Sequence, residues 1–204
     1  MTRTRPSFRL LALTATLGLA AMIPPAASAQ AKQTPQTQQE DFSGFAINLN
    51  SGPRTATVDF RIERWSTDDE RQTLLGIITG EKESYQSNQR LLQTLQKMPK
   101  TGYIKTQRTL AWDLKYARQS PLEEGGRRIV LATDRPIGIW EGVAQPRTMD
   151  YPFTIVEMHL DANDKGTGKI LAGTRIYIGK DNNLVLENWG QQPVRFNEIH
   201  KVKR

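Results

Sequence analysis

The amino-acid sequence predicts a mainly β domain. It is an antiparallel meander, closed as a barrel or stacked as a sandwich, with a two-helix insertion after an early strand. Apolar and polar residues alternate along several segments after residue 55, as they do in strands with one buried and one solvated face. Turn residues separate these segments roughly every 8–12 positions. Helical spacing of apolar residues is confined to residues 67–98.

Residues 1–29 have the features of a secretory signal peptide. Three arginines precede an apolar segment at residues 10–23, and Ala-Ser-Ala at residues 27–29 supplies the small residues of a cleavage site. The apolar segment is shorter than the ~20 residues that a membrane-spanning helix needs, which argues against an anchor. We therefore expect cleavage after Ala29 and a mature protein in the bacterial periplasm or the medium, without a membrane span.

Composition excludes several classes of function. The chain has no cysteine, so it has no disulfides, no thiolate chemistry, no cysteine-based metal site and no lipid-modified cysteine. The net charge of +7 falls to +4 without the three arginines of the leader, and basic residues alternate with acidic ones. Nucleic-acid binding would require a basic stripe with interleaved aromatic residues, so we expect no nucleic-acid partner.

The first part of the mature chain contains a tether and two strands. Residues 30–41 are rich in glutamine and have no large apolar residue, which predicts a disordered tether. A single β-rich domain is expected at residues 42–204, beginning with a strand at 42–49. The next strand, at 55–65, alternates cleanly; one face carries Ala56, Val58, Phe60 and Ile62.

A helical hairpin is expected at residues 67–98. Thr67 and Glu70 form a capping-box pattern, and acidic residues in the first turn suit the positive end of a helix dipole. Gly80 is a plausible end of the first helix, and Pro99 follows the second. A further strand is expected to begin at residue 103. The remaining expected strands cover residues 110–118, 127–133, 137–143, 153–160, 169–178, 184–187 and 194–202.

Glu157 and His159 are candidate ligand-binding residues, and their role depends on the register of their strand. An even-length loop at 161–168 would place both side chains on an apolar face. A buried Glu-x-His pair there destabilises the fold unless hydrogen bonds or opposite charges satisfy it, and such pairs often mark a functional site. An odd-length loop would turn Val156, Met158 and Leu160 inward and leave both polar residues in water. We favour this second register.

Two tryptophans complete the candidate site. Trp112 and Trp140 fall on different expected strands, where an aromatic side chain can line a ligand cleft or simply pack in the core. Neither His159 nor His200 belongs to a metal-binding or catalytic-triad motif, so no metal, cofactor or catalytic residue is assigned. Residues 161–166 resemble the start of a calcium loop, but Lys165 occupies a ligand position, and a hairpin turn is the simpler interpretation.

Several segments resemble a family of exported bacterial proteins that has no assigned activity. The segments are R-I-E-R-W-S-T-D-D-E-R, D-L-K-Y-A-R, R-R-I-V-L-A-T-D-R-P-I, D-Y-P-F-T-I-V-E-M-H-L-D and E-N-W-G-Q-Q-P-V-R. The resemblance covers roughly residues 56–202. It implies a single exported domain and assigns no function to any residue.

Three classes of function remain open. The first is a non-catalytic binding module of the cell envelope for a small or apolar ligand or a partner protein, which requires only a concave β scaffold and aromatic residues. The second is an acid–base enzyme built on Glu157 and His159. The third is a structural or assembly factor that uses the helical hairpin or a sheet edge as its contact surface. Oligomeric state is not determined by the sequence.

Overall fold

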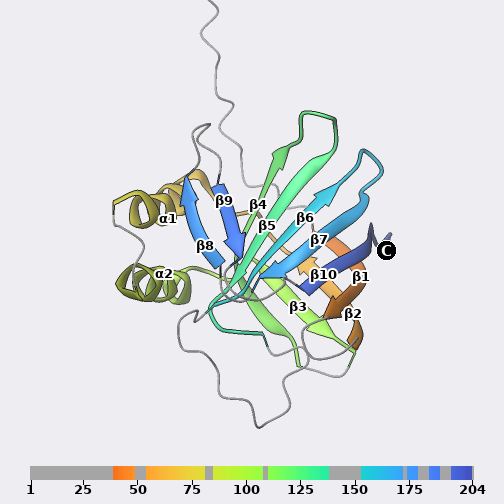
Figure 1. Ribbon diagram of the computed structural model, residues 1–204, viewed down its shortest axis with the longest axis horizontal. Helices are drawn as coiled ribbons and strands as arrows, with labels where there is room; N and C mark the ends of the chain where they lie inside the picture. The colour runs from red at the N-terminus through yellow and green to blue at the C-terminus, as the bar shows by residue number, and fades with distance from the viewer. Residues whose placement is uncertain are drawn as a thin grey trace, which may run out of the picture. The chain divides into compact units, whose positions relative to one another are not determined.

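Eight antiparallel strands close into a barrel in the computed structural model (Figure 1). The structure describes residues 39–48, 54–80, 85–107, 110–137, 153–171, 174–178, 184–188 and 194–203, all within the unit Lys32–Arg204. Around the barrel the order is β1 (Glu40–Asn48), β10 (Val194–Lys201), β7 (Lys165–Leu171), β6 (Ile155–Leu160), β5 (Arg127–Thr133), β4 (Trp112–Pro121), β3 (Gly102–Thr106) and β2 (Arg54–Ile62). The prediction of a mainly β meander with a two-helix insertion is confirmed, and the meander is a barrel.

Large apolar side chains fill the inside of the barrel. The expected faces of β2 are confirmed, because Val58, Phe60 and Ile62 are fully buried. Phe60 meets Phe196 of β10 edge to face, with 5.0 Å between ring centroids. The residues that the barrel strands contribute to this core are Phe42, Ala46, Val58, Phe60, Ile62, Ile104, Leu114, Ala117, Ile129, Leu131, Val156, Met158, Leu160, Ile170, Phe196 and Ile199.

The helical insertion begins at the expected capping box. Helix α1 covers Asp68–Gly80 and α2 covers Tyr85–Lys97. The backbone N–H of Thr67 donates to Glu70 Oε2 at 2.9 Å, and the backbone N–H of Glu70 donates to Thr67 Oγ1 at 3.2 Å. These two bonds satisfy donors that the first turn of a helix cannot pair internally.

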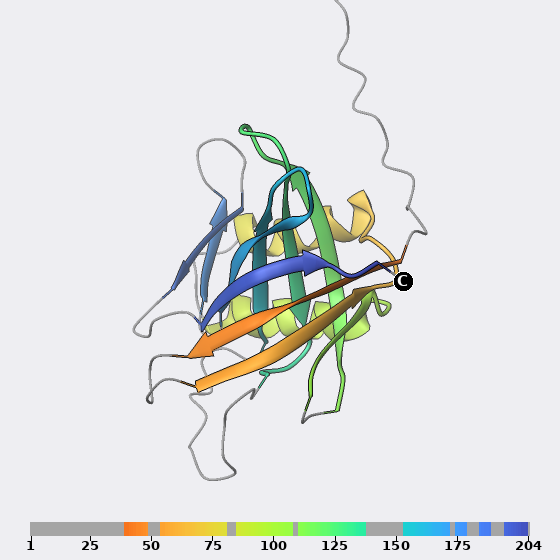
Figure 2. The same cartoon turned by 90° about the vertical axis from the view of Figure 1, so that its right-hand side faces the viewer.

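The helices cover part of the outer surface of the barrel. Figure 2 shows the two helices behind the strands of the barrel wall. Apolar residues of α1 and α2 form a second core with outward-facing residues of β4, β5 and β6. An ion pair of 2.7 Å between Asp68 and Arg118 joins the start of α1 to β4. The members of the second core are Leu74, Leu91, Leu95, Met98, Tyr116, Val130, Ala132, Phe153, Ile155 and Leu171.

One expected strand is divided in the structure. The sequence predicts a single strand at 169–178, but β7 ends at Leu171 and β8 (Thr174–Ile178) pairs instead with β9 (Leu184–Asn188) in a separate two-stranded sheet. Strand β8 lies against α1. The prediction was wrong because alternation within one segment carries no information about which sheet each half joins.

The turn between β6 and β7 is shorter than expected and decides the register. Asp161 Oδ1 accepts hydrogen bonds from the backbone N–H groups of Asn163 and Lys165 at 2.8 and 3.0 Å, and these donors lower the pKa of Asp161. Asp164 has a φ of 59°, as in three-residue hairpin loops. This odd-length turn places Val156 opposite Ile170 in the core.

An ionic cluster ties together the strands at one end of the barrel. The Arg127 guanidinium lies 2.8 Å from Glu40 Oε2 and 2.7 Å from Asp164 Oδ1, and Lys201 lies 3.3 Å from the other oxygen of Glu40. Arg127 also lies over the ring of Phe42, 5.5 Å from its centroid. The cluster engages the start of β1, which begins two residues before the expected position.

Some expectations fall on parts of the chain that the structure does not describe. They are the signal peptide at 1–29, most of the tether at 30–41, residues 138–143 of an expected strand, and Trp140. Among the described residues, no helix is both long enough and apolar enough to cross a bilayer.

The capping box makes a quantitative prediction. Thr67→Ala should lower the free energy of unfolding by about 1 kcal/mol because one helix-terminal N–H loses its acceptor. Thr73→Ala is the control: Thr73 is exposed within the same helix, and among the described residues its hydroxyl bonds only to the carbonyl of Asp69, so its loss should be nearly neutral. Denaturant titration of both variants measures the difference. Equal effects would contradict the cap.

The close contact between β6 and β7 makes a second prediction. A Cβ added at Gly166 would lie 1.9 Å from the carbonyl oxygen of His159, whereas one added at Gly76 of α1 would meet nothing within 4 Å. Gly166→Ala should therefore lower the free energy of unfolding by about 1–3 kcal/mol, and Gly76→Ala should raise it by about 0.4–1 kcal/mol. Thermal unfolding of the pair tests this, and a neutral Gly166→Ala would show that the strands separate easily.

Candidate functional site

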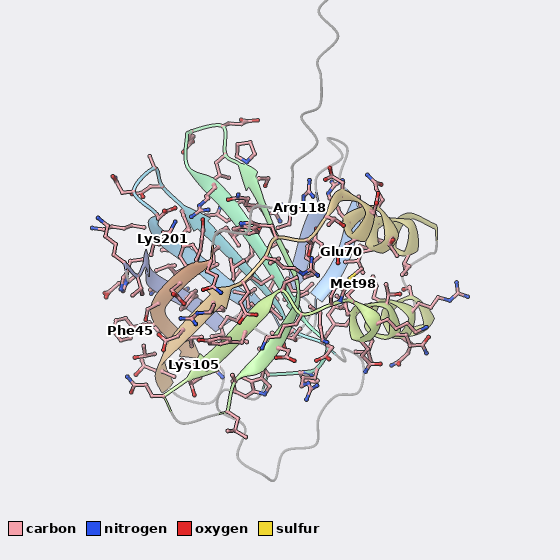
Figure 3. The ribbon with its side chains drawn as sticks, turned by 180° about the vertical axis from the view of Figure 1, so that it is seen from behind. Phe45, Glu70, Met98, Lys105, Arg118 and Lys201 are labelled. Atoms are coloured by element: carbon pink, nitrogen blue, oxygen red, sulfur yellow. The ribbon has the colours of Figure 1, made fainter. Side chains whose placement is uncertain are left out.

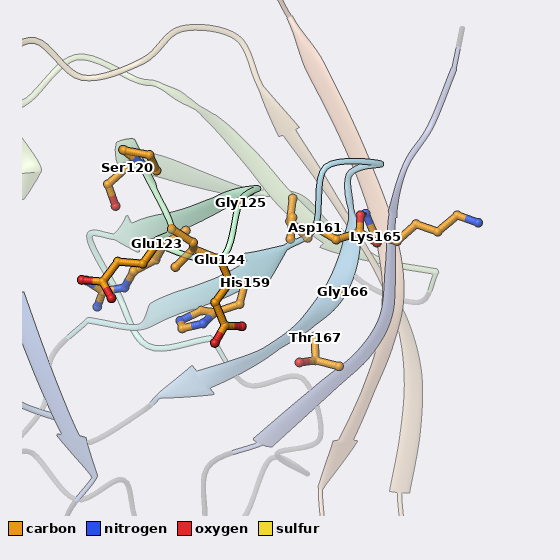
Figure 4. Close-up of a pocket in the computed structure, with 13 residues that line it drawn as sticks. Ser120, Glu123, Glu124, Gly125, His159, Asp161, Lys165, Gly166 and Thr167 are labelled. Atoms are coloured by element: carbon orange, nitrogen blue, oxygen red, sulfur yellow. The ribbon is translucent and has the colours of Figure 1, made fainter.

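A cleft opens between the turn that joins β4 to β5 and the hairpin of β6 and β7 (Figure 4). Its volume is about 750 Å³, within the usual range of small-molecule sites. It lies on the outer surface of the barrel. The lining residues are Ser120, Pro121, Leu122, Glu123, Glu124, Gly125, Arg128, His159, Leu160, Asp161, Lys165, Gly166 and Thr167.

Strand register explains which side chains reach the cleft. Ser120, Arg128, His159 and Thr167 are consecutive partners across β4, β5, β6 and β7. Directly paired residues of neighbouring strands point to the same face of a sheet. They therefore form one row on the outer face, and the neighbouring row two residues away contains Glu157.

Glu157 lies on the outer face of β6 and is nevertheless buried, with 4% of its surface exposed. Arg128 Nε lies 2.5 Å from Oε1, His159 Nε2 lies 3.2 Å from the same oxygen, and Lys169 Nζ lies 3.0 Å from Oε2. The favoured register was therefore right about the apolar face of β6. The expectation that both polar residues lie in water was right for His159, whose side chain is 52% exposed, and wrong for Glu157.

The cations keep the Glu157 carboxylate ionised. Burial alone would raise the pKa of Glu157, but the hydrogen bond from Lys169, the charge of Arg128 and the hydrogen bond from His159 outweigh burial and lower it. A carboxylate with a lowered pKa is a weak proton acceptor. The geometry therefore gives little support to the acid–base enzyme, and the role it indicates for Glu157 is to hold Arg128, Lys169 and His159 in place.

Acceptor groups dominate the mouth of the cleft. In neutral His159, Nε2 faces a carboxylate and must carry the hydrogen, so Nδ1 is an acceptor. Glu123 and Glu124 are exposed on the β4–β5 turn and have no ion pair with any other residue that the structure describes. Figure 4 shows Glu124 beside His159 and the Lys165 side chain extending away from both.

The tryptophans do not complete this cleft. Trp112 lies at the other end of β4, where it is paired with Ile104 and packs against the barrel core. Trp140 lies outside the described residues. Sequence reasoning missed Glu123, Glu124 and Arg128, because only the fold brings the turn over His159. The single available signal was the E-E-G-G turn at residues 123–126.

Comparison of the chain with models of protein families, with curated proteins and with solved structures gives no match. Within the described ranges, no group of three or more histidine, aspartate or glutamate side chains is arranged to hold a metal ion. The geometry of the cleft is therefore the basis on which a function can be assigned.

The Glu157 cluster predicts a pH-dependent contribution to stability. A lowered pKa in the folded state stabilises the protein above the ordinary glutamate value of 4.5, and this contribution is lost as pH falls through the folded value. Glu157→Gln should lower the free energy of unfolding at neutral pH by about 1–3 kcal/mol. It should also weaken the dependence of stability on pH below 4.5.

The control for this prediction is His159→Gln, which alters a half-exposed partner of the same carboxylate and should change stability by less than about 0.5 kcal/mol. Denaturant titration across the acidic range measures both variants. If the stability of Glu157→Gln depends on pH as steeply as that of the parent protein, the carboxylate is not held ionised by its neighbours.

Proposed function

We propose that the protein is an exported, non-catalytic binding protein whose ligand occupies the cleft between the two hairpins, outside the barrel. The observation that carries the proposal is the cleft itself: about 750 Å³ of open space lined by the exposed His159 and by Glu123 and Glu124, which have no ion pair among the residues that the structure describes. The signal-peptide pattern of residues 1–29 supports export.

The other spaces suit a ligand less well. Side chains that are almost completely buried fill the inside of the barrel, so an apolar ligand would have to displace the core. The gap between the helices and the outer face of β4, β5 and β6 is apolar, but it holds only about 50 Å³. Sites for small molecules usually measure about 300–1,000 Å³.

The chemistry of the cleft favours a polar ligand that carries amino groups. Glu123 and Glu124 offer negative charge at the rim, and Nδ1 of the His159 ring, in its neutral form, is an acceptor beside Glu124. Arg128 and Lys169 are engaged by Glu157, so the positive charge nearest to the cleft is already partly neutralised. An ammonium group donates three hydrogen bonds and accepts none, which matches this set of acceptors.

The test compares two probe molecules of equal length, one a dication and the other a dianion. In NMR titrations of the mature protein, 1,4-diaminobutane should shift the amide signals of Gly125, His159 and Thr167, and succinate should not. Glu124→Gln should weaken the binding of the diamine about tenfold, because a charge-assisted hydrogen bond is lost. Asp69→Asn, which removes an exposed carboxylate from α1, should leave the affinity unchanged.

Two results would count against the proposal. Absence of saturable shifts with either probe below about 10 mM, together with native mass spectrometry that finds no co-purified small molecule, would favour the structural or assembly role. Binding of succinate in place of the diamine would keep the cleft as the site and overturn the assignment of its ligand.

A further inference from the structure

A second polar cleft lies on another part of the barrel, on the outer face of β10, β1, β2 and β3. Its volume is about 280 Å³. Four of its lining residues are consecutive cross-strand partners: His200 pairs with Ser43, Ser43 with Asp59, and Asp59 with Lys105. Figure 3 shows Lys105 on the side of the barrel away from Glu70 and Met98 of the helical layer.

The backbone of β10 is distorted where it enters this cleft. Glu198 has a φ of 53°, which is unusual for a residue other than glycine. The pairing of β10 shifts here against both neighbours, between Phe196 and Ile199 on the β7 side and between Ser43 and Phe45 on the β1 side. Bulges of this kind redirect side chains and are frequent beside functional sites. Here the bulge leaves Ile199 in the core and His200 at the surface.

Hydrogen bonds within the cleft leave three acceptors beside one another. His200 Nδ1 lies 3.0 Å from the carbonyl oxygen of Glu198. A carbonyl can only accept, so Nδ1 carries the hydrogen and Nε2 of the neutral ring is an acceptor. The Ser43 hydroxyl donates to Asp59 Oδ1 at 2.8 Å, so its own oxygen and the second oxygen of Asp59 remain available as acceptors.

One cation completes the cleft. Lys105 lines it and is the β2–β3 neighbour of Asp59, yet neither residue has an ion pair with any residue in the described part of the chain. An ammonium and a carboxylate on adjacent strands that remain unpaired are each able to engage a ligand group of opposite charge.

We propose that this cleft binds a small zwitterion with a primary ammonium and a carboxylate, such as an amino acid. The ammonium donates its three hydrogen bonds to Ser43 Oγ, Asp59 and His200 Nε2, and the carboxylate pairs with Lys105. The volume of about 280 Å³ suits a molecule of this size. This site is separate from the hairpin cleft, although His200 of this cleft and Lys165 of the hairpin cleft are cross-strand partners.

The proposal is tested with 4-aminobutanoate and its two halves, butylamine and butanoate, in NMR titrations of the mature protein. We expect 4-aminobutanoate to shift the signals of Ser43, Asp59, Lys105 and His200 with saturation. Each half should bind about tenfold more weakly, since it loses one charge-assisted contact. The NMR signals of Gly125 and Thr167 report binding in the hairpin cleft, so binding at the two clefts is distinguished in the same titration.

Ser43→Ala and Lys105→Met should each weaken the binding of 4-aminobutanoate about tenfold. Thr55→Ala on β2 and Lys97→Met on α2 are the matched controls, since both side chains are exposed away from the cleft, and they should leave the affinity unchanged. Absence of saturable shifts below about 10 mM would overturn the site. If butylamine or butanoate binds as tightly as 4-aminobutanoate, the ligand is not a zwitterion. This comparison uses the unmodified protein, so it does not depend on the folding of any variant.

Discussion

The packing of large side chains inside a closed eight-stranded barrel is the constraint on which the rest of the molecule depends. A barrel of eight strands is just wide enough for side chains to fill it. Here Phe42, Phe60 and Phe196 occupy that space together with aliphatic residues, and each is at most 1% exposed. Because the inside is apolar and full, the polar chemistry of the strands has to lie on the outer face.

That outer face changes character along a single strand. On β6, Ile155 packs in the core beneath the helices, Glu157 is buried two residues farther along, and His159 reaches the open cleft. A buried carboxylate is stable only when opposite charges and hydrogen bonds replace its lost hydration. Arg128 and Lys169, from the two neighbouring strands, supply them. The helical layer packs on this face farther along the strand and contributes no residue to the lining of the cleft.

The elements that the sequence predicted well depend on local information. Alternation along β2 identified its buried face, and the capping box at Thr67 and Glu70 marked the start of α1 to within a residue. The elements predicted poorly depend on partners elsewhere. The segment at 169–178 alternates without interruption in the sequence, yet its two halves join different sheets. The burial of Glu157 is likewise not encoded in β6, because the cations that cover it belong to β5 and β7.

The sequence by itself determined that the domain is mainly β with a two-helix insertion, and it identified the apolar face of β2, since these features follow from spacing within one segment. For β6 the sequence left two registers open, and the odd-length turn after the strand decided which face is buried. It also carries the signal-peptide pattern from which export is inferred. Only the tertiary structure decided that the meander closes into a barrel and which polar residues meet. Glu124 comes beside His159, and His200 comes beside Ser43, through turns and strand registers that join distant parts of the chain. Contacts of that kind depend on the pairing of whole strands, and no local pattern of residues specifies them.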